Sequence, residues 1–318
     1  MDPVSHVIFG RTLIALDRRG RLGAGAIAAA VLGALSPDID ALAIFRGWDV
    51  YLRVHEIGTH SIVGSAVMGS AAGTLVYFLK RGARYAGLVL AGAAGALSHV
   101  VFDLVSGAHI RLGWPFLHGR ASLPLAAMAD PWLIAICAAG ALGLWTLRRR
   151  AFIVATTVVA AIATFLTVKG VLMTVAVPQW RAATSADTIV DHAVEASWSS
   201  LTAWDVSDRT PVALRKWRVN AMGSPALLFS IPSRSDSPLV VASRSFDTVQ
   251  NFLRVHDLGF AVTTPLDAGT QVLWSDIRYC CSATECALWF GGVFDRDGRP
   301  VTQVVRVGAW QQTRPVLP

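Results

Sequence analysis

Four histidines and three aspartates within the first 103 residues are the side chains best suited to chemistry. Each lies at or near an end of an apolar stretch, where ionisable groups are costly and usually functional. Imidazole and carboxylate together are the ligand set that suits zinc and similar divalent ions. The seven residues are His6, Asp38, Asp40, His55, His60, His99 and Asp103. Seven groups exceed what one tetrahedral ion needs, so they predict a site for two or more metal ions.

The spacing of these residues supports part of this prediction. His99 and Asp103 are four residues apart in a helical pattern, so they share one helix face. His55 and His60 are five apart and do not share a face, which places them across a junction between a loop and a helix. The same spacing is one residue longer than the H-E-x-x-H motif of zinc proteases, and it excludes that class.

Each residue also has a purely structural explanation. Asp38 and Asp40 follow Pro37, and such a turn commonly caps a helix. His60 or His99, taken alone, would more often be a hydrogen-bonded residue inside a bundle. The convergence of seven groups from four segments favours the metal site over these separate explanations.

Apolar stretches must position the seven residues. The chain is 53% hydrophobic and 15% charged, against a charged share of about 25% in soluble domains. Stretches 58–79, 85–105 and 152–177 reach the roughly 20 residues that span a bilayer, and 131–147 is near the lower limit. Stretches 3–16 and 22–35 are shorter. We therefore expect an α-helical polytopic membrane bundle of about six helices, two of them short.

Basic residues predict the orientation of this bundle. Three clusters lie between consecutive pairs of stretches and should be cytoplasmic: Arg18, Arg19 and Arg21; Lys80, Arg81 and Arg84; and Arg148, Arg149 and Arg150. The seven candidate ligands then share the extracytoplasmic side with loops 37–57 and 106–130. The formal net charge of +7 reflects topology in this interpretation, and no nucleic-acid partner is expected.

The composition changes near residue 177, which predicts a membrane domain over 1–177 and an exported β-rich domain over 178–318. Valine and glutamine alternate with other residues from 301 to 307, residues 295–298 form a turn signal, and strand-like runs cover 270–281 and 286–294. Because an exported domain permits disulfides, Cys281–Cys286 is the preferred bridge, with free buried thiols as the alternative.

The motifs resemble the YdjM-like family of bacterial membrane-bound metal-dependent hydrolases. Its pattern is an early histidine, L-x-x-x-x-P-D-x-D, H-R-x-x-T-H-S, S-H-x-x-x-D and W-P-F. These elements correspond to His6, the run from Leu32 to Asp40, the run from His55 to Ser61, the run from Ser98 to Asp103, and Trp114-Pro115-Phe116. An exported D-x-R-Y strand of some members resembles Asp276 to Tyr279. Glu56 replaces the usual arginine and would serve as a weak candidate for a catalytic base or a further ligand.

The resemblance implies an enzyme of the bacterial inner membrane, distantly similar to zinc-dependent phospholipase C. Its expected cofactor is a divalent metal, zinc in two or more copies, with manganese as an alternative. Metal-activated water would cleave phosphoester bonds of lipid, small-molecule or envelope-derived substrates. The alternative is a metal-binding transporter, or a membrane anchor for the exported domain, without enzymatic activity. Lys169, inside the last stretch, would pair within the bundle or extend toward the interface.

Overall fold

The computed structural model describes residues 2–55, 57–80, 82–232 and 237–316. Two compact units divide the chain, and each contains segments that are distant in sequence. We call the first the helical unit; it comprises Met1–Asp40, His55–Val175 and Glu195–Trp204. The second, the β unit, comprises Ala41–Val54, Ala176–Val194 and Asp205–Pro318.

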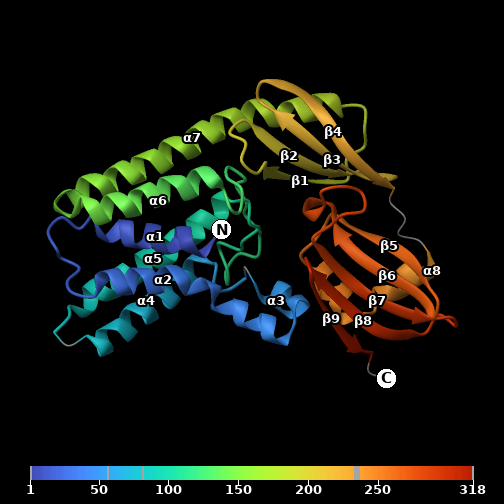
Figure 1. Cartoon of the computed structure of the whole chain (residues 1–318), viewed down its shortest axis with the longest axis horizontal. Helices are drawn as coiled ribbons and strands as arrows, with labels where there is room; N and C mark the ends of the chain where they lie inside the picture. Colours follow the sequence, from blue (N-terminus) through green and yellow to red (C-terminus); the bar gives the residue numbers. More distant parts are fainter. Residues whose placement is uncertain (1, 56, 81, 233–236, 317–318) are drawn as a thin grey trace. The chain divides into compact units, whose positions relative to one another are not determined.

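Helices form at the apolar stretches of the first half of the chain (Figure 1). They are α1 (Pro3–Ile14), α2 (Ala26–Leu35), the 3₁₀ helix η1 (Pro37–Arg46), α4 (Ile62–Leu79), α5 (Tyr85–Val105), α6 (Pro131–Thr146), the 3₁₀ helix η2 (Arg148–Arg150) and α7 (Ala151–Ala183). Asp2 caps α1 by accepting a hydrogen bond from Ser5 N, and Asp130 caps α6 in the same way. Pro3 and Pro131 follow these caps, where a missing N–H costs nothing.

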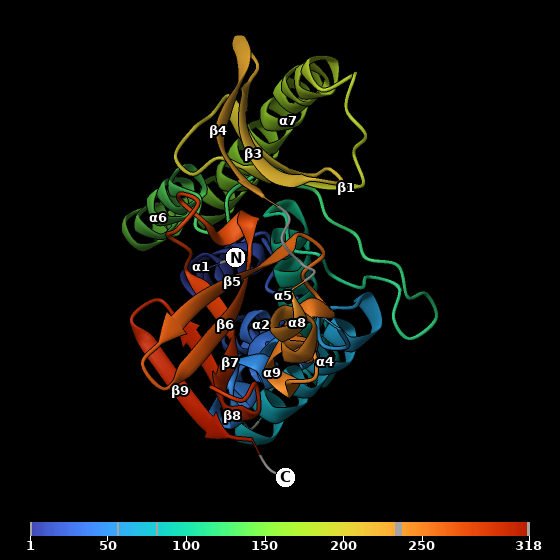
Figure 2. The ribbon, with the colours of Figure 1, turned by 90° about the vertical axis from the view of Figure 1, so that its right-hand side faces the viewer.

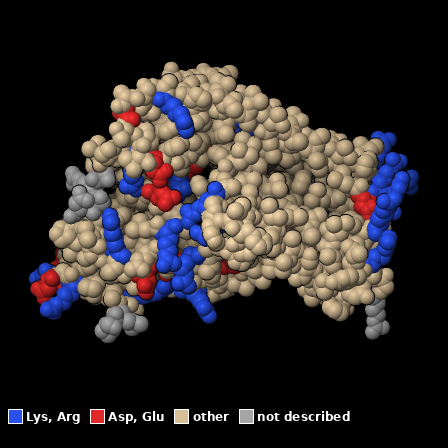
Figure 3. Space-filling view, turned by 180° about the vertical axis from the view of Figure 1, so that it is seen from behind, with Lys and Arg blue, Asp and Glu red and all other residues tan. Residues whose placement is uncertain are grey.

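Three of these helical segments are long and apolar enough to cross a membrane: α4, α5, and η2 continued by α7. A fourth span is possible if α2 and η1, which meet at a bend of 45°, are taken as one broken segment. The remaining helices are shorter, α6 with 16 residues and α1 with 12. Figure 3 shows basic side chains gathered at the end of the helical unit where the turns α1–α2, α4–α5 and α6–α7 lie in Figure 1.

Small residues let three helices of this unit approach closely. A Cβ atom on Gly33 of α2 would collide with the carbonyl oxygen of Gly92 in α5, and one on Gly69 of α4 would collide with the same carbonyl. Without side chains at these positions the backbones come into contact, as is common between membrane helices. This packing brings the C-terminal half of α5 beside the C-terminal end of α2, where several of the candidate ligands lie.

Two antiparallel sheets form most of the second half of the chain. The first has the order β1-β2-β3-β4 and the second the order β5-β6-β7-β8-β9. Their bounds are β1 (Asp191–Ala196), β2 (Ala203–Arg209), β3 (Ala213–Asn220), β4 (Gly223–Pro232), β5 (Gly259–Leu266), β6 (Gly269–Asp276), β7 (Leu288–Asp295), β8 (Pro300–Val307) and β9 (Trp310–Pro315). The predicted turn at residues 295–298 joins β7 to β8.

The five-stranded sheet is buried on both faces because alternate residues of each strand point to opposite sides. Leu273 belongs to one apolar cluster with Leu214 and Ile231 of the first sheet. Its neighbours Val272 and Trp274 belong to another cluster. That cluster contains residues of two short helices, α8 (Pro238–Ser243) and α9 (Asp247–Leu253), which lie beside the sheet in Figure 2. These helices were not anticipated in a region expected to be mostly β structure.

The preferred disulfide was wrong by one residue. Cys280 and Cys286 form the bond, and Cys281 is an exposed free thiol. Cys280 and Cys286 face each other in an isolated antiparallel bridge, whereas the next residue along an extended chain points to the other side. Proximity in sequence alone could not distinguish the two cysteines.

Candidate metal centre

The structure brings all seven candidate ligands together in the helical unit. Figure 1 shows that α1 begins and α2 ends at the end of this unit opposite the turn that joins them. Four segments contribute them. His6 comes from the first half of α1, and the two aspartates Asp38 and Asp40 come from the start of η1. His55 and His60 both lie in the segment between Val54 and α4, so they do not share a helix face but also do not span the predicted junction, and His99 and Asp103 lie near the C-terminal end of α5.

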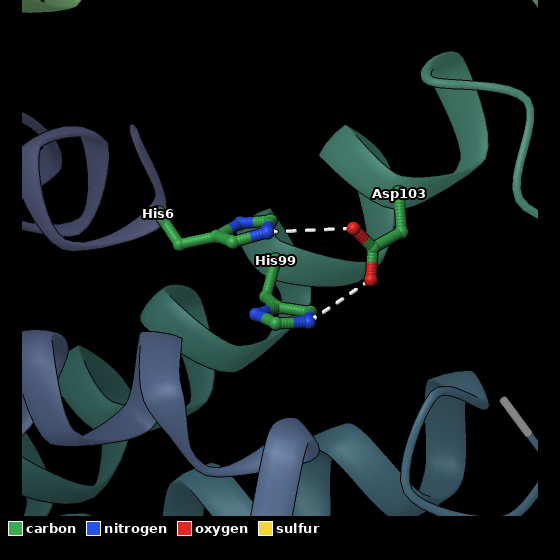
Figure 4. A group of neighbouring side chains, drawn as sticks. All are labelled: His6, His99 and Asp103. Carbon is green, nitrogen blue, oxygen red and sulfur yellow. Dashed lines mark ion pairs between the residues drawn. The ribbon is translucent and has the colours of Figure 1, made fainter. Parts of the chain in front are cut away.

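The ligand atoms form three overlapping groups, and within each group the atoms lie within 4.8 Å of one another. His6, His99 and Asp103 form the innermost group (Figure 4). Asp103 contacts both imidazoles from one side, with Oδ2 at 2.9 Å from His99 Nε2 and Oδ1 at 3.3 Å from His6 Nε2. The imidazoles of His6 and His99 are stacked, with 3.8 Å between ring centroids. The four-residue spacing therefore places His99 and Asp103 on one face, as predicted.

The second and third groups continue outward from the first. Asp38, His60 and His99 form the second group, in which Asp38 Oδ1 lies 3.4 Å from His60 Nε2 and 3.5 Å from His99 Nε2. Asp40, His55 and His60 form the third, in which Asp40 Oδ1 lies 3.0 Å from His55 Nδ1. His99 is shared by the first two groups and His60 by the last two. Because one imidazole nitrogen binds one ion, overlapping groups would be alternative ligand sets within one continuous site and could not all be filled at once.

Neighbouring groups fix the orientation of the shared ligands. The His99 Nδ1–H group donates to the carbonyl oxygen of Ala34 at 2.7 Å, which leaves Nε2 facing the cluster as a potential ligand. The Thr59 hydroxyl donates to Asp40 Oδ2 at 3.0 Å and also lies 3.0 Å from His60 Nδ1. Neither Thr59 nor Ala34 is among the seven predicted ligands, and the role of Ala34 belongs to its backbone carbonyl, which residue type does not reveal.

Two observations test whether a metal ion fits this set. His6 is fully buried, yet neither of its ring nitrogens has a hydrogen-bond partner among the described residues. Its approach to Asp103 is close in distance but not directed as a hydrogen bond. In addition, His60 Nε2 and His99 Nε2 face each other at 3.3 Å beside two carboxylates. Unpaired buried nitrogens and converging acceptors are what a cation would satisfy, so the donor set fits a divalent metal.

Carboxylates also determine the charge of His60. Burial disfavours a charged imidazole, but Asp103, Asp38 and Asp40 outweigh this cost and raise the pKa of His60 to about 11. The acids therefore favour a positive charge at the point where the second and third groups meet. Solvent reaches the cluster from the outer side, because the side chain of Asp38 is 30% exposed and that of His55 is 20% exposed, whereas His60 is fully buried.

The remaining candidate residues lie elsewhere. Glu56, the proposed base, falls outside the described residues. Lys169 is buried in the helical unit, where its ammonium group donates to the Ser200 carbonyl at 3.0 Å and lies 4.3 Å from the centre of the Trp204 ring. It therefore pairs within this unit, one of the two expected outcomes.

A family model described as YdjM inner membrane protein matches residues 1–175. The chain belongs to this family. The matched region contains all seven candidate ligands, and together with the apolar helices it supports a location in the membrane. Neither curated proteins nor solved structures gave a match to the chain. The resemblance inferred from the motifs is thus confirmed for this YdjM-family region, which ends before the first β-strand.

Proposed function

We propose that this protein is a membrane-bound metal-dependent hydrolase that cleaves phosphoester bonds of lipid or envelope-derived substrates. The observation that carries the proposal is the chain of three ligand groups that share His60 and His99. A turn-capping or packing role would require no such overlap among four histidines and three aspartates. Zinc is the expected ion and manganese the alternative, because imidazole and carboxylate ligands suit both.

Residues at different depths of the cluster would have different roles. His6, His99 and Asp103 would hold an inner ion, and Asp38, Asp40, His55 and His60 would hold an outer ion, because the single free nitrogen of His99 can bind only one ion. Bound divalent ions supply Lewis acidity that activates water and neutralises charge on a phosphoryl group. Ala34 and Thr59 keep the ligand atoms directed at the cluster, and the stacked pair of His6 and His99 occupies its inner end.

The exposed side of the cluster indicates how a substrate would approach. Asp38 and His55 are the ligands most accessible to solvent, so the reacting phosphate would enter from their side. Because the cluster lies at one end of apolar helices, lipid head groups and their phosphorylated breakdown products are the nearest substrates. This reasoning supports a phosphoester substrate over a peptide.

The alternative functions account for less of the structure. A membrane anchor would need none of the seven ligands. A transporter should carry ionisable groups along several helices, but the candidate ligands lie at one end and Lys169 is engaged by Ser200 and Trp204. Metal analysis separates an anchor from the other two functions, and ion uptake into vesicles separates a transporter from a hydrolase.

The purified full chain provides the test. Its zinc and manganese content is measured first, followed by turnover of phospholipids and phosphomonoesters with and without a chelator. We expect bound metal and chelator-sensitive turnover, both lost in His99→Ala. The exposed His118 is the matched control, and His118→Ala should behave as the wild type. Absence of turnover on both substrate classes, or turnover insensitive to the chelator and to His99→Ala, would contradict the proposal.

We further propose that the cluster and the β unit face the extracytoplasmic side, as the basic turns predict. Cys281 offers a direct test because it is an exposed thiol in the β unit, whereas Cys137 is buried. A membrane-impermeant maleimide should label wild-type protein in intact spheroplasts, and Cys281→Ser should abolish this label. Labelling that appears only after lysis would place the β unit in the cytoplasm.

A further inference from the structure

One segment of the first half of the chain packs with the β unit. Ala41–Val54 contains the second half of η1 and the short helix α3 (Trp48–Val54), and it belongs to the β unit. Its two flanking residues, Asp40 and His55, belong to the helical unit and are candidate ligands of the outer metal group. They also contact each other, with 3.0 Å between Asp40 Oδ1 and His55 Nδ1. The segment is therefore a closed loop with two ligands at its base.

Apolar contacts hold this loop in the β unit. Trp48 and Leu52 of α3 pack against the cluster that contains Val249 and Phe252 of α9. Trp48 also meets Tyr51 edge to face, with 5.6 Å between ring centroids. One face of α3 is thus part of the β-unit core, and moving the loop would expose this face to water at a cost set by its apolar area.

Polar contacts hold the same loop more specifically. Asp49 is 1% exposed, and its Oδ1 lies 2.8 Å from Arg314 Nη2 in β9. Its Oδ2 accepts hydrogen bonds from Asn251 Nδ2 at 3.1 Å and Arg314 Nη1 at 3.4 Å. Arg314 Nη2 also donates to the Arg46 carbonyl at 2.9 Å. We call Asp49, Asn251 and Arg314 the clasp. Its members are up to 265 positions apart in sequence.

Gly47 shows that the clasp requires a close approach. Its φ of +138° favours glycine, and a Cβ atom there would occupy the position of the Arg314 guanidinium group. The loop backbone is therefore shaped to admit Arg314. A surface ion pair formed incidentally would impose no such requirement on the backbone beside it.

We infer that the clasp sets the separation of the outer metal ligands Asp40 and His55 by fixing the loop that joins them. Arg314, Asn251 and Asp49 are positioning residues, because they act through the loop and do not belong to the ligand groups. Metal ligands must be held within about 0.5 Å of their working geometry. The clasp supplies this restraint from a part of the chain that lies beyond the YdjM-family match. The metal-binding consequence rests on the proposed function, whereas the restraint of the loop does not.

Hydrogen–deuterium exchange of the full-length protein tests the restraint directly. The variants are Arg314→Ala, the conservative Arg314→Lys, and the control Arg306→Ala, whose side chain hydrogen-bonds Gln311 on the neighbouring strand. We expect Arg314→Ala to accelerate exchange about tenfold in peptides covering 37–40 and 55–61, because losing hydrogen bonds to a charged group shifts the local opening equilibrium by about this factor. Exchange within α5 and within β6 and β7 should not change, Arg314→Lys should restore part of the protection, and Arg306→Ala should match the wild type.

Acceleration confined to residues 41–54, or none, would overturn the inference. If Arg314→Ala also accelerates exchange in β6 and β7, it has loosened the whole sheet. The variant Trp48→Ala then replaces it, because Trp48 belongs to the loop. Exchange in peptides 37–40 and 55–61 of this variant tests the inference in the same way. Metal titration of the same variants provides the second readout. We expect Arg314→Ala to weaken zinc binding by about 10-fold to 100-fold. A wild type that binds no zinc or manganese would refute the proposed function, while the exchange result would still decide the clasp.

Discussion

Aspartates have different partners in the two units. In the β unit, Asp208 pairs with Arg215 and Asp276 pairs with Arg278, and a guanidinium group carries a permanent charge. In the helical unit, Asp38 and Asp40 face histidines, whose charge depends on protonation. Among the described residues, no arginine or lysine forms an ion pair with Asp38 or Asp40.

This difference distinguishes a structural acid from a candidate ligand. An acid paired with arginine is neutralised within the fold, and its removal leaves a buried charge without compensation. An acid that faces only imidazoles remains available to a metal ion, because metal binding displaces the imidazole proton, and its removal costs the fold less. Stability measurements on the two kinds of aspartate should therefore diverge.

Asp208→Ala should give the largest loss of stability. Asp208 is fully buried and accepts hydrogen bonds from the indoles of Trp180 and Trp217 as well as from Arg215. We expect the free energy of unfolding of the β unit to fall by about 3–5 kcal/mol. Urea unfolding followed by tryptophan fluorescence measures it. Asp205→Ala, which removes a partly exposed pair, should cost at most about 1 kcal/mol, and equal losses would contradict the comparison.

Asp38→Asn should reduce the stabilisation by metal much more than the stability of the metal-free protein. Without metal, the variant should melt only slightly below the wild type, because Asp38 is partly exposed and is one of three carboxylates that face His60. Metal at 100 times its dissociation constant should stabilise the wild type by about 2.7 kcal/mol and the variant by much less. Melting curves with chelator and with zinc measure both effects, with the exposed Asp297→Asn as the control. A large loss without metal would make Asp38 a structural acid.

Thr59→Val should have a moderate effect on metal binding. Valine keeps the shape of threonine but removes the hydroxyl that orients Asp40 and contacts His60. We expect zinc affinity to fall by about 10-fold to 100-fold. Isothermal titration checks this, and Thr74→Val, which removes a hydroxyl bonded to the Ser70 carbonyl within α4, should leave affinity unchanged. Unchanged affinity in Thr59→Val would remove Thr59 from the site.

The smallest effect should come from the pH dependence of Asp276. Burial raises the pKa of this carboxyl, but the bidentate pairing with Arg278 outweighs burial and holds the pKa below the ordinary 3.8. The unfolded chain therefore binds the proton more readily, and the stabilisation is present above pH 3.8 and lost as the pH falls. Urea midpoints at pH 7 and pH 3 should differ less in Asp276→Asn than in the wild type. An equal difference would exclude this contribution.

Local patterns sufficed for much of the candidate site. The apolar stretches became helices, and the spacing of His99 and Asp103 correctly indicated a shared face. Residue types and their places at helix ends selected seven side chains that converge in space. The basic turns gather at the opposite end of the helical unit, as alternating helices require. These features depend on periodicity and composition, which are properties of short windows of sequence.

Predictions that depended on local detail in the second half were less accurate. The choice between Cys280 and Cys281 depends on which side chain faces Cys286 across an antiparallel pair. The short helices α8 and α9 form where Val240 of the first and Phe252 of the second can cover a sheet face. Neither signal exists within a short window, because each depends on strand register or on a distant partner.

Residue type and spacing were thus enough to predict the potential ligands, because helical periodicity and the cost of ionisable groups in apolar surroundings act locally. Their grouping into three sets, the orientation of His99 by Ala34, and the clasp of Asp49 with Arg314 depend on the folded chain. These contacts join residues tens to hundreds of positions apart. Sequence spacing carries no information about such distances, because they arise only when close-packed helices and two-sided sheets bring remote backbone and side-chain groups together.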